Sequence, residues 1–250
     1  MDRLRFKRGT VAALAAAVVW VATGVATASA ADRLPDLGMA RLSDFRVEKT
    51  GSGRTLLRYT TIIVNVGQGR FELRGQRSST TQTQMTVSQR VYNDTGGSRL
   101  VSTPAVMVFG GDGHNHWHVR DLETSALIRL DNGSKVGTGA KRGFCFFDNT
   151  RYRLTLPGAP QSPVYTGCGT SASLIVNMGL SIGWGDAYFW SLPDQYIDIT
   201  GLTPGRYRLR VTADAQNRFL ETSNSNNTTW VDLQLKGNAR PRVIAYGPSA

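Results

Sequence analysis

The chain has 250 residues and a formal net charge of +11 at pH 7, from 29 Lys and Arg against 18 Asp and Glu. After the first thirty residues no segment approaches the ~18 uninterrupted apolar residues of a membrane span, so a membrane-spanning mature chain is not expected. A basic surface suits anionic partners such as a cell-wall polymer, and it suits simple solvation equally well.

The first thirty residues are typical of a secretory signal peptide. A basic start is followed by the uncharged run TVAALAAAVVWVATGVATASA, which ends in the small residues Ala28–Ala30. We therefore expect residues 1–30 to be removed and residues 31–250 to form the mature, secreted domain. An uncleaved membrane anchor is the alternative. Export makes nucleic acid an unexpected partner and association with the cell wall a reasonable one.

Alternating apolar and polar residues dominate the rest of the chain. In RYRLRVTAD, residues 206–214, the apolar side chains fall on one face and the arginines on the other. Similar runs, rich in β-branched residues, cover residues 55–67, 84–92, 125–130 and 228–235. The pattern predicts an all-β fold, namely a β-sandwich-like single domain with long irregular loops.

Two stretches between these runs carry loop signals. Asn132-Gly133 is typical of a type I′ hairpin turn, because both residues tolerate positive φ. Residues 154–187 are rich in Gly, Pro and Ser and are expected to be irregular, which usually indicates a functional or crosslinked segment. Cys168 lies there, and Cys145 is the other cysteine. In an exported protein two cysteines most simply form a disulfide, with thiolate metal ligation as the alternative.

All the histidines of the chain lie in the segment GHNHWH, as His114, His116 and His118. On a β-strand, side chains at i, i+2 and i+4 point to the same side. The glycines just before them permit the bend that converging rings need. Neutral imidazole binds Cu, Zn, Fe or Ni, and Cu(II) leads in intrinsic affinity. The cluster therefore predicts a metal site.

Three kinds of metal site compete for this cluster. A zinc hydrolase would carry a nearby carboxylate, as in His-Glu-x-x-His, and the sequence lacks that motif. A cupin-like enzyme fits the spacing of Gly110, His116, His118 and Glu123 but needs a further histidine downstream, which the sequence also lacks. A copper amine oxidase is the third kind.

Several motifs resemble the catalytic domain of the lysyl oxidase family. GHNHWH corresponds to the family's copper motif, and GAKRGFCFFDN (139–149) is similar to the segment that carries its crosslinking lysine. The most specific match is GLSIGWGDAYFWSLPDQYIDITGLTPGRYRLRV (179–211). The resemblance runs from Leu34 to about Leu235, with weaker stretches between these motifs.

The resemblance implies that His114, His116 and His118 hold copper and that Lys141 and Tyr188 are joined as a lysine tyrosylquinone cofactor. Such a cofactor, with O₂, converts a primary amine or peptidyl lysine into an aldehyde, NH₃ and H₂O₂. Other copper amine oxidases build topaquinone within an Asn-Tyr-Asp/Glu tripeptide, which this sequence does not contain.

The resemblance also implies a structural calcium site. Its oxygen ligands would come from six residues: Asp36, Leu37, Glu221, Ser223, Asn226 and Asn227. Ser223 stands where the family usually has an aspartate, so one negative charge is missing. A polar hairpin loop without metal is the alternative.

The sequence leaves alternatives open for the role of Asp186 and for the class of function. Asp186, two residues before Tyr188, is the candidate catalytic base, and a turn-forming aspartate is the alternative. Two other functions stay open. One is a non-enzymatic secreted copper- or calcium-binding β-sandwich, and the other is a cupin-like metal enzyme.

Overall fold

The computed structural model describes residue 1 and residues 30–110, 115–237 and 239–250. Every regular element in these residues is a β-strand, and the strands form three antiparallel sheets, which confirms the predicted all-β class. No helix in the described part of the chain has the length and hydrophobicity to cross a membrane. Most of the predicted signal peptide, and His114, lie outside the described residues.

The first sheet contains seven strands. They are β1 (Asp32–Arg33), β5 (Phe71–Gln76), β6 (Gln84–Asn93), β7 (Ser98–Phe109), β8 (Trp117–Arg120), β11 (Gly143–Phe144) and β13 (Ile175–Leu180). Their order is β11-β8-β7-β6-β5-β13, with β1 also paired to β6. This sheet carries the described histidines, because His118 lies in β8 and His116 directly precedes it.

The other two sheets are built around long central strands. One contains β9 (Glu123–Arg129), β10 (Lys135–Thr138), β16 (Gly205–Ala213), β17 (Thr228–Leu235) and β18 (Arg242–Tyr246), in the order β10-β9-β16-β17-β18. The other contains β2 (Leu37–Met39), β3 (Ser43–Lys49), β4 (Thr55–Asn65), β12 (Thr150–Arg151), β14 (Trp184–Tyr188) and β15 (Tyr196–Asp198). In this last sheet β2, β3, β14 and β15 all pair with β4.

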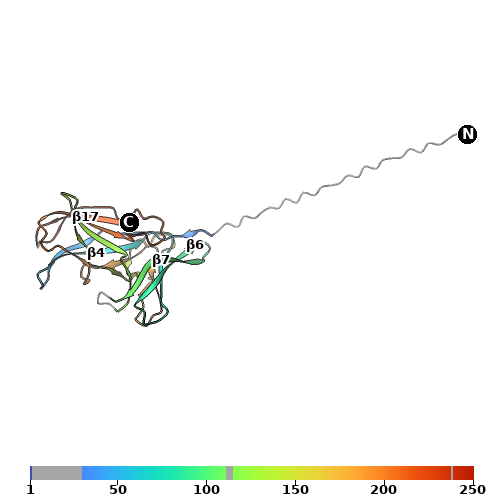
Figure 1. Cartoon of the computed structure of the whole chain (residues 1–250). Helices are drawn as coiled ribbons and strands as arrows, with labels where there is room; N and C mark the ends of the chain where they lie inside the picture. The colour runs from blue at the N-terminus through green and yellow to red at the C-terminus, as the bar shows by residue number, and fades with distance from the viewer. Residues whose placement is uncertain (2–29, 111–114, 238) are drawn as a thin grey trace.

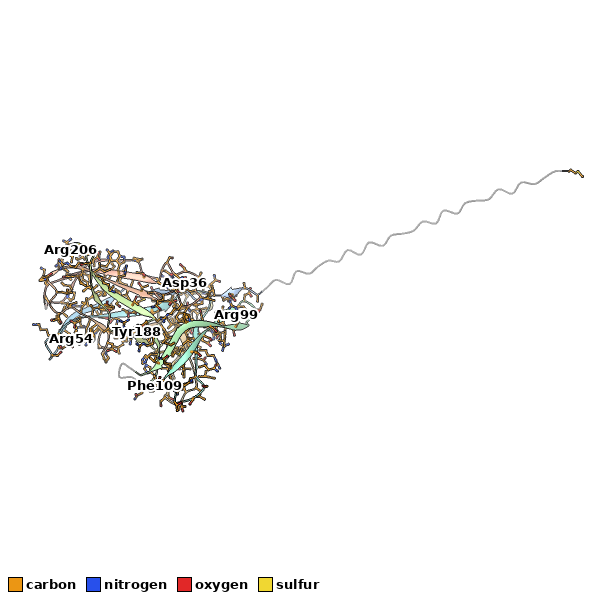
Figure 2. All side chains as sticks on the ribbon, viewed as in Figure 1. Asp36, Arg54, Arg99, Phe109, Tyr188 and Arg206 are labelled. Carbon is orange, nitrogen blue, oxygen red and sulfur yellow. A yellow bond between two sulfur atoms is a disulfide. The ribbon has the colours of Figure 1, made fainter. Side chains whose placement is uncertain are left out.

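Alternation along β16 and β17 produces the sandwich part of the fold. Tyr207, Leu209 and Val211 are completely buried, as expected for the apolar face of β16. They belong to a single hydrophobic core that also takes residues from the β4 and β8 sheets. Figure 1 shows β17 lying over β4, while β6 and β7 extend beside this pair. Figure 2 shows Tyr188 inside the folded part of the chain and Arg206 at its edge.

The prediction that residues 154–187 are irregular is wrong for their second half. β13 and β14 lie there and pair with β5 and β4. Their glycines, which obscured the pattern, are required by close packing. A Cβ on Gly179 would lie 2.1 Å from the Phe71 carbonyl oxygen, and one on Gly185 would lie 2.9 Å from Ile62. All residues of β14 are buried, so no polar alternation is present in its sequence.

The hairpin predicted at Asn132-Gly133 joins β9 to β10, but its turn is not type I′. Only Gly133 of the pair has positive φ, at 72°. The loop closes through the Arg129 N–H, which donates to the Ser134 carbonyl at 2.9 Å. The Asn132 side chain accepts a bond from the Ser134 N–H at 3.0 Å, an Asx turn that a two-residue loop would not need.

Candidate functional site

The histidine segment enters the core at the start of β8. His116 lies in a bend before the strand, and the Gly110 N–H donates to its carbonyl at 3.0 Å. His118 lies within the strand and is 1% exposed. The two rings are neighbours, with centroids 4.5 Å apart and planes at 48°. The bend expected from the glycines is therefore present, but the cluster does not lie wholly on a strand, since β8 begins at Trp117.

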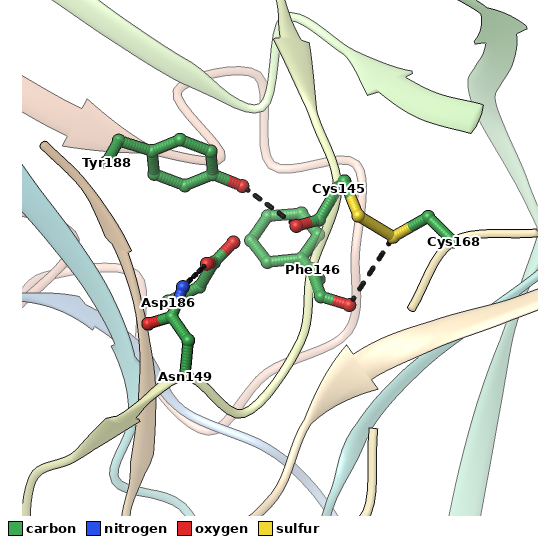
Figure 3. Close-up of a disulfide and its surroundings, with 6 residues drawn as sticks. All are labelled: Cys145, Phe146, Asn149, Cys168, Asp186 and Tyr188. Carbon is green, nitrogen blue, oxygen red and sulfur yellow. Dashed lines mark hydrogen bonds between the residues drawn. A yellow bond between two sulfur atoms is a disulfide. The ribbon is translucent and has the colours of Figure 1, made fainter. Parts of the chain in front are cut away.

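The lysine and the tyrosine chosen from the sequence lie together. The Lys141 Nζ atom is 4.9 Å from the centroid of the Tyr188 ring and 5.3 Å from that of Phe144. The Phe144 and Tyr188 rings form an edge-to-face pair with centroids 5.1 Å apart. Tyr188 is the last residue of β14 and is buried, and its hydroxyl donates to the Cys145 carbonyl at 3.2 Å (Figure 3).

Backbone hydrogen bonds to β9 and β15 hold the chain segment that carries Lys141. The Gly139 N–H donates to the Ser125 carbonyl at 2.9 Å, and the Ala140 N–H donates to the Tyr196 carbonyl at 3.0 Å. A Cβ on Gly139 would lie 3.0 Å from Ser125, so the close approach to β9 needs a glycine here. These contacts fix the backbone directly before the lysine.

The predicted Cys145–Cys168 disulfide is confirmed, with Cα atoms 5.8 Å apart. It connects the lysine segment to the loop that flanks the histidines, because the Trp117 N–H donates to the Cys168 carbonyl at 3.0 Å. Since the Cys145 carbonyl also receives the Tyr188 hydroxyl, one crosslink joins three parts of the site (Figure 3).

Two buried carboxyl groups face this arrangement, on Asp186 and Glu123. Burial raises the pKa of Asp186 well above its ordinary value, and the Tyr188 hydroxyl and the charge of Lys141 oppose that shift. Burial also raises the pKa of Glu123 to about 7, against the effects of the Thr61 hydroxyl, Lys141 and another hydroxyl. Within the described residues, one oxygen of each carboxyl, Asp186 Oδ2 and Glu123 Oε2, has no hydrogen-bond partner.

A cavity of about 240 Å³ lies beside Asp186 and the lysine–tyrosine pair. His116, His118, Lys141, Asp186 and Tyr188 line one part of it. The remaining wall is largely apolar and includes Phe147, Phe189 and Leu192. Phe189 is 55% exposed, an unusual position for a large aromatic side chain. An apolar pocket with a few convergent polar groups is the ordinary form of a small-molecule site.

The two described imidazoles suit a transition metal, but the predicted ligand set is not fully visible. Neutral imidazole is a good ligand for copper, and two rings in contact can share one ion. The third predicted ligand, His114, lies outside the described residues. Within those residues, no group of three or more His, Cys, Asp and Glu side chains is arranged to hold a metal ion.

The six residues predicted for calcium lie on two neighbouring segments. The Leu37 N–H donates to Glu221 Oε2 at 2.9 Å, and the Asn227 amide donates to Glu221 Oε1 at 2.7 Å. The Asn226 amide donates to Asp36 Oδ1 at 2.7 Å. The amide oxygens of Asn226 and Asn227 are buried and have no partner in the described part of the chain. These oxygens and carboxylates fit the hard, oxygen-rich environment of calcium.

Ser223 is the exception in this set. Its hydroxyl is paired with that of Ser225 at 2.8 Å, within its own exposed loop. Burial raises the pKa of Glu221 to about 7, so the negative charge of the set is costly to form without a cation. The structure thus brings five of the six residues into two adjoining hydrogen-bonded groups, Leu37–Glu221–Asn227 and Asp36–Asn226.

Sequence reasoning missed the residues that support the site. Asn149 donates to Asp186 Oδ1 at 2.6 Å and accepts from the Ala187 N–H at 2.8 Å, which orients the carboxyl (Figure 3). It ends the segment GFCFFDN, where a polar pair after an apolar run is a weak signal of such a role. The sequence pattern indicates Glu123 only as a ligand of a cupin-like site.

The fold and the site define a class of protein: an all-β domain in which a histidine pair, a lysine and a tyrosine surround one buried cavity. A family model described as Lysyl oxidase matches residues 109–244, which is more than half of the chain. The chain therefore belongs to the lysyl oxidase family.

Individual relatives agree with this membership. Protein-lysine 6-oxidase of Gallus gallus is 32% identical over 159 residues, which cover 60% of this chain and 33% of the relative. Lysyl oxidase homolog 1 of Homo sapiens is 31% identical over 133 residues, covering 50% of this chain and 20% of the relative. Lysyl oxidase homolog 3 of Homo sapiens is 27% identical over 132 residues, covering 50% of this chain and 15% of the relative. The chain thus matches at most a third of the length of these relatives.

Proposed function

We propose that the protein is a secreted copper-dependent amine oxidase acting on primary amines, peptidyl lysine among them. The overall reaction takes a primary amine, O₂ and water to an aldehyde, NH₃ and H₂O₂. The observation that carries the proposal is the placement of the Lys141 Nζ atom 4.9 Å from the Tyr188 ring, inside a cavity that two histidines also line.

Lys141 and Tyr188 are the proposed precursors of a lysine tyrosylquinone. Copper held by His114, His116 and His118, together with O₂, would supply the oxidation that allows a Nζ-to-ring bond. One O₂ places a second oxygen on the Tyr188 ring and yields water. Addition of the Lys141 Nζ atom replaces a ring hydrogen, and a second O₂ takes up the released hydrogens and electrons as H₂O₂. The short reach between lysine and ring supports this pairing, because a near-attack arrangement needs little further reorganisation.

The rest of the cavity is suited to a small amine. Phe147, Phe189 and Leu192 offer an apolar wall for an alkyl chain, while the polar groups gather at the opposite end. Asp186 is the candidate base, and its Oδ2 atom is the proposed proton acceptor. Asn149 holds the other oxygen at 2.6 Å, so the carboxyl has one fixed orientation.

A calcium ion is proposed as a second, structural ligand. Asp36, Glu221, Asn226 and Asn227 would bind it through side-chain oxygens, and the Leu37 carbonyl would add a further oxygen. Support comes from the hydrogen bonds among these residues and from the orphaned amide oxygens of the two asparagines. Ser223 would contribute a weaker ligand than the aspartate usual in the family.

Secretion is proposed on the basis of the N-terminal pattern and of the Cys145–Cys168 disulfide, which suits an oxidising compartment. N-terminal sequencing of protein recovered outside the cells should start at Ala31. The excess of basic residues supports loose attachment to an anionic wall polymer, which salt should release.

Intact mass and peptide mapping of copper-loaded protein test the enzymatic proposal. We expect a crosslinked peptide containing Lys141 and Tyr188, and H₂O₂ release on addition of a primary amine. Tyr188→Phe and Lys141→Met should abolish both, with copper content unchanged.

Two results would contradict the enzymatic proposal. Copper binding with two separate peptides and no reaction with carbonyl reagents would indicate a copper-binding β-sandwich instead. Full activity of Lys141→Met would favour a cupin-like enzyme.

A further inference from the structure

Glu123 is a buried acid for which the proposed reaction has so far no role. It is the first residue of β9 and is 4% exposed. Its Oε2 atom has no hydrogen-bond partner among the residues that the structure describes. A buried carboxylate without compensation is costly, so natural proteins keep one only beside a cation or in a neutral form.

The position of Glu123 is fixed by the same strand that fixes the lysine segment. Ser125, two residues further along β9, accepts the backbone bond from Gly139, which lies two residues before Lys141. A Cβ on Gly139 would lie 3.0 Å from the Ser125 Cβ, so the Ser125 side chain lies against this segment, and Glu123 shares its face of the strand. β10 pairs antiparallel with β9, with Thr138 opposite Ala126, so the chain beyond Gly139 continues toward Glu123. The Thr61 hydroxyl, which accepts from the Gln195 amide at 3.2 Å, opposes the rise in the pKa of Glu123.

The cation that acts on Glu123 is Lys141. Its charge opposes the effect of burial on the pKa of Glu123 and also on that of Asp186. The Lys141 Nζ atom lies 4.9 Å from the centroid of the Tyr188 ring, on the chain that continues from β10 along β9 toward Glu123. Asp186 has one oxygen held by Asn149 at 2.6 Å. The Thr61 and Ser125 hydroxyls act on Glu123, whose Oε2 atom has no partner among the described residues.

We propose that Glu123 is the counter-ion that positions the Lys141 amine against the Tyr188 ring. Glu123 acts through Lys141 and not on the substrate, so it is a positioning residue. The pairing itself is a property of the folded, metal-free chain. Its purpose, formation of the Lys141–Tyr188 bond, rests on the proposed function.

Amine labelling of the metal-free protein at pH ~8, where Glu123 is ionised, tests the pairing directly. Lys49, Lys135 and Lys236 are exposed and serve as internal references. Glu123→Gln removes the counter-ion of the Lys141 amine, so the relative labelling rate of Lys141 should increase, by up to about tenfold.

Matched variants separate the pairing from general damage. Glu72→Gln removes another buried glutamate that is paired with Arg90 and should leave Lys141 labelling unchanged. Glu123→Asp keeps the negative charge, but the shorter side chain places it further from Lys141. Lys141 should therefore be labelled at a rate between those of the wild type and Glu123→Gln. If Glu123→Gln does not fold, the shift seen with Glu123→Asp decides the matter.

The second measurement is the yield of crosslinked peptide after loading with copper in air. Glu123→Gln should lower the yield while binding as much copper as the wild type, and Glu123→Asp should restore part of it. Equal Lys141 labelling in wild type and Glu123→Gln would overturn the proposal. Loss of copper from Glu123→Gln would also overturn it, since Glu123 would then be a metal ligand. If wild type itself gives no crosslink, the proposed function fails, and the labelling result still decides the pairing.

Discussion

Two groups of buried carboxyls in this molecule differ in how their charge is compensated. In the first sheet, Glu72 accepts hydrogen bonds from Arg90 at 2.8 Å, Tyr92 at 2.6 Å and Tyr165 at 2.7 Å. In contrast, Asp186, which lines the cavity, and Glu123 each keep one oxygen without a partner among the described residues.

The pKa shifts follow this difference. Burial acts to raise the pKa of Glu72, but the hydroxyls of Tyr92 and Tyr165 and the Arg90 guanidinium outweigh it and hold the pKa below its ordinary value. Burial prevails at Glu123 and Asp186. Glu72 is 8% exposed, Glu123 4% and Asp186 1%, so Glu72 is both somewhat less deeply buried and better compensated than the other two acids. Incompletely satisfied acids beside a cavity are typical of functional sites.

The largest expected effect is on catalysis. Asp186→Asn keeps the bond to Asn149 but removes the proton acceptor, so we expect kcat to fall by roughly 10²–10⁴-fold. Glu72→Gln should leave kcat within about twofold of the wild type, because it lies outside the cavity. H₂O₂ release under saturating amine, normalised to crosslinked protein, gives both values. An Asp186→Asn variant with wild-type kcat would remove Asp186 from the mechanism.

For stability, Glu72→Gln should have a larger effect than Glu123→Gln. Glu72→Gln leaves Arg90 without its anion and one tyrosine hydroxyl poorly matched, so the free energy of unfolding should drop by about 1–3 kcal/mol. Glu123→Gln removes a carboxyl that is costly to ionise, and its proposed counter-ion Lys141 is only partly buried, so the free energy of unfolding should change by less than about 1 kcal/mol. Urea unfolding of the metal-free variants at neutral pH measures both. A larger loss for Glu123→Gln than for Glu72→Gln would contradict the comparison.

The pH dependence of stability should have opposite signs at the two acids. The lowered pKa of Glu72 gives a contribution that is complete above the ordinary glutamate pKa and is lost as the pH falls through the lowered value. The raised pKa of Glu123, about 7, gives a contribution that is complete below the ordinary glutamate pKa and is lost as the pH rises through about 7.

Unfolding curves of metal-free protein between about pH 3 and pH 9 reveal these signs. The stability difference between wild type and Glu72→Gln should shrink toward the acid end. Relative to Glu123→Gln, the wild type should lose stability toward the alkaline end. Parallel pH profiles for wild type and either variant would show that the corresponding acid titrates alike in the folded and unfolded chain.

The sequence predicted strands with one exposed face better than it predicted the fully buried strand and the residues around the cavity. Alternation identified β16 and β17, because each has one face in the core and one in water. β14 was missed because it is buried on both faces, although its residue Tyr188 was found through the family motif. Glu123 and Asn149 were missed as site residues because their roles depend on neighbours that only the fold brings together.

The carboxyl of Glu221, in the proposed calcium site, provides an intermediate case for the comparison. Both oxygens of Glu221 accept hydrogen bonds, from the Leu37 N–H and the Asn227 amide, yet burial still raises its pKa to about 7. Neutral donors therefore do not compensate the charge as Arg90 does for Glu72. A cation in this loop would supply the missing compensation.

The smallest expected effect is at Ser223. Ser223→Asp adds the carboxylate usual in the family, so calcium should bind roughly tenfold more tightly, and the Tm rise at a fixed calcium concentration should grow accordingly. Without calcium the same variant should be slightly less stable, because the new charge lies near Asp36 and Glu221.

Ser225→Asp is the matched control, since it places the same charge on the hydroxyl partner of Ser223 in the same exposed loop. It should change calcium affinity much less. Equal gains in the two variants would mean that added negative charge alone, and not a ligand at position 223, controls the affinity. A gain confined to Ser223→Asp would mean that the loop geometry of a calcium ligand set persists, and that this chain lacks only one of its charges.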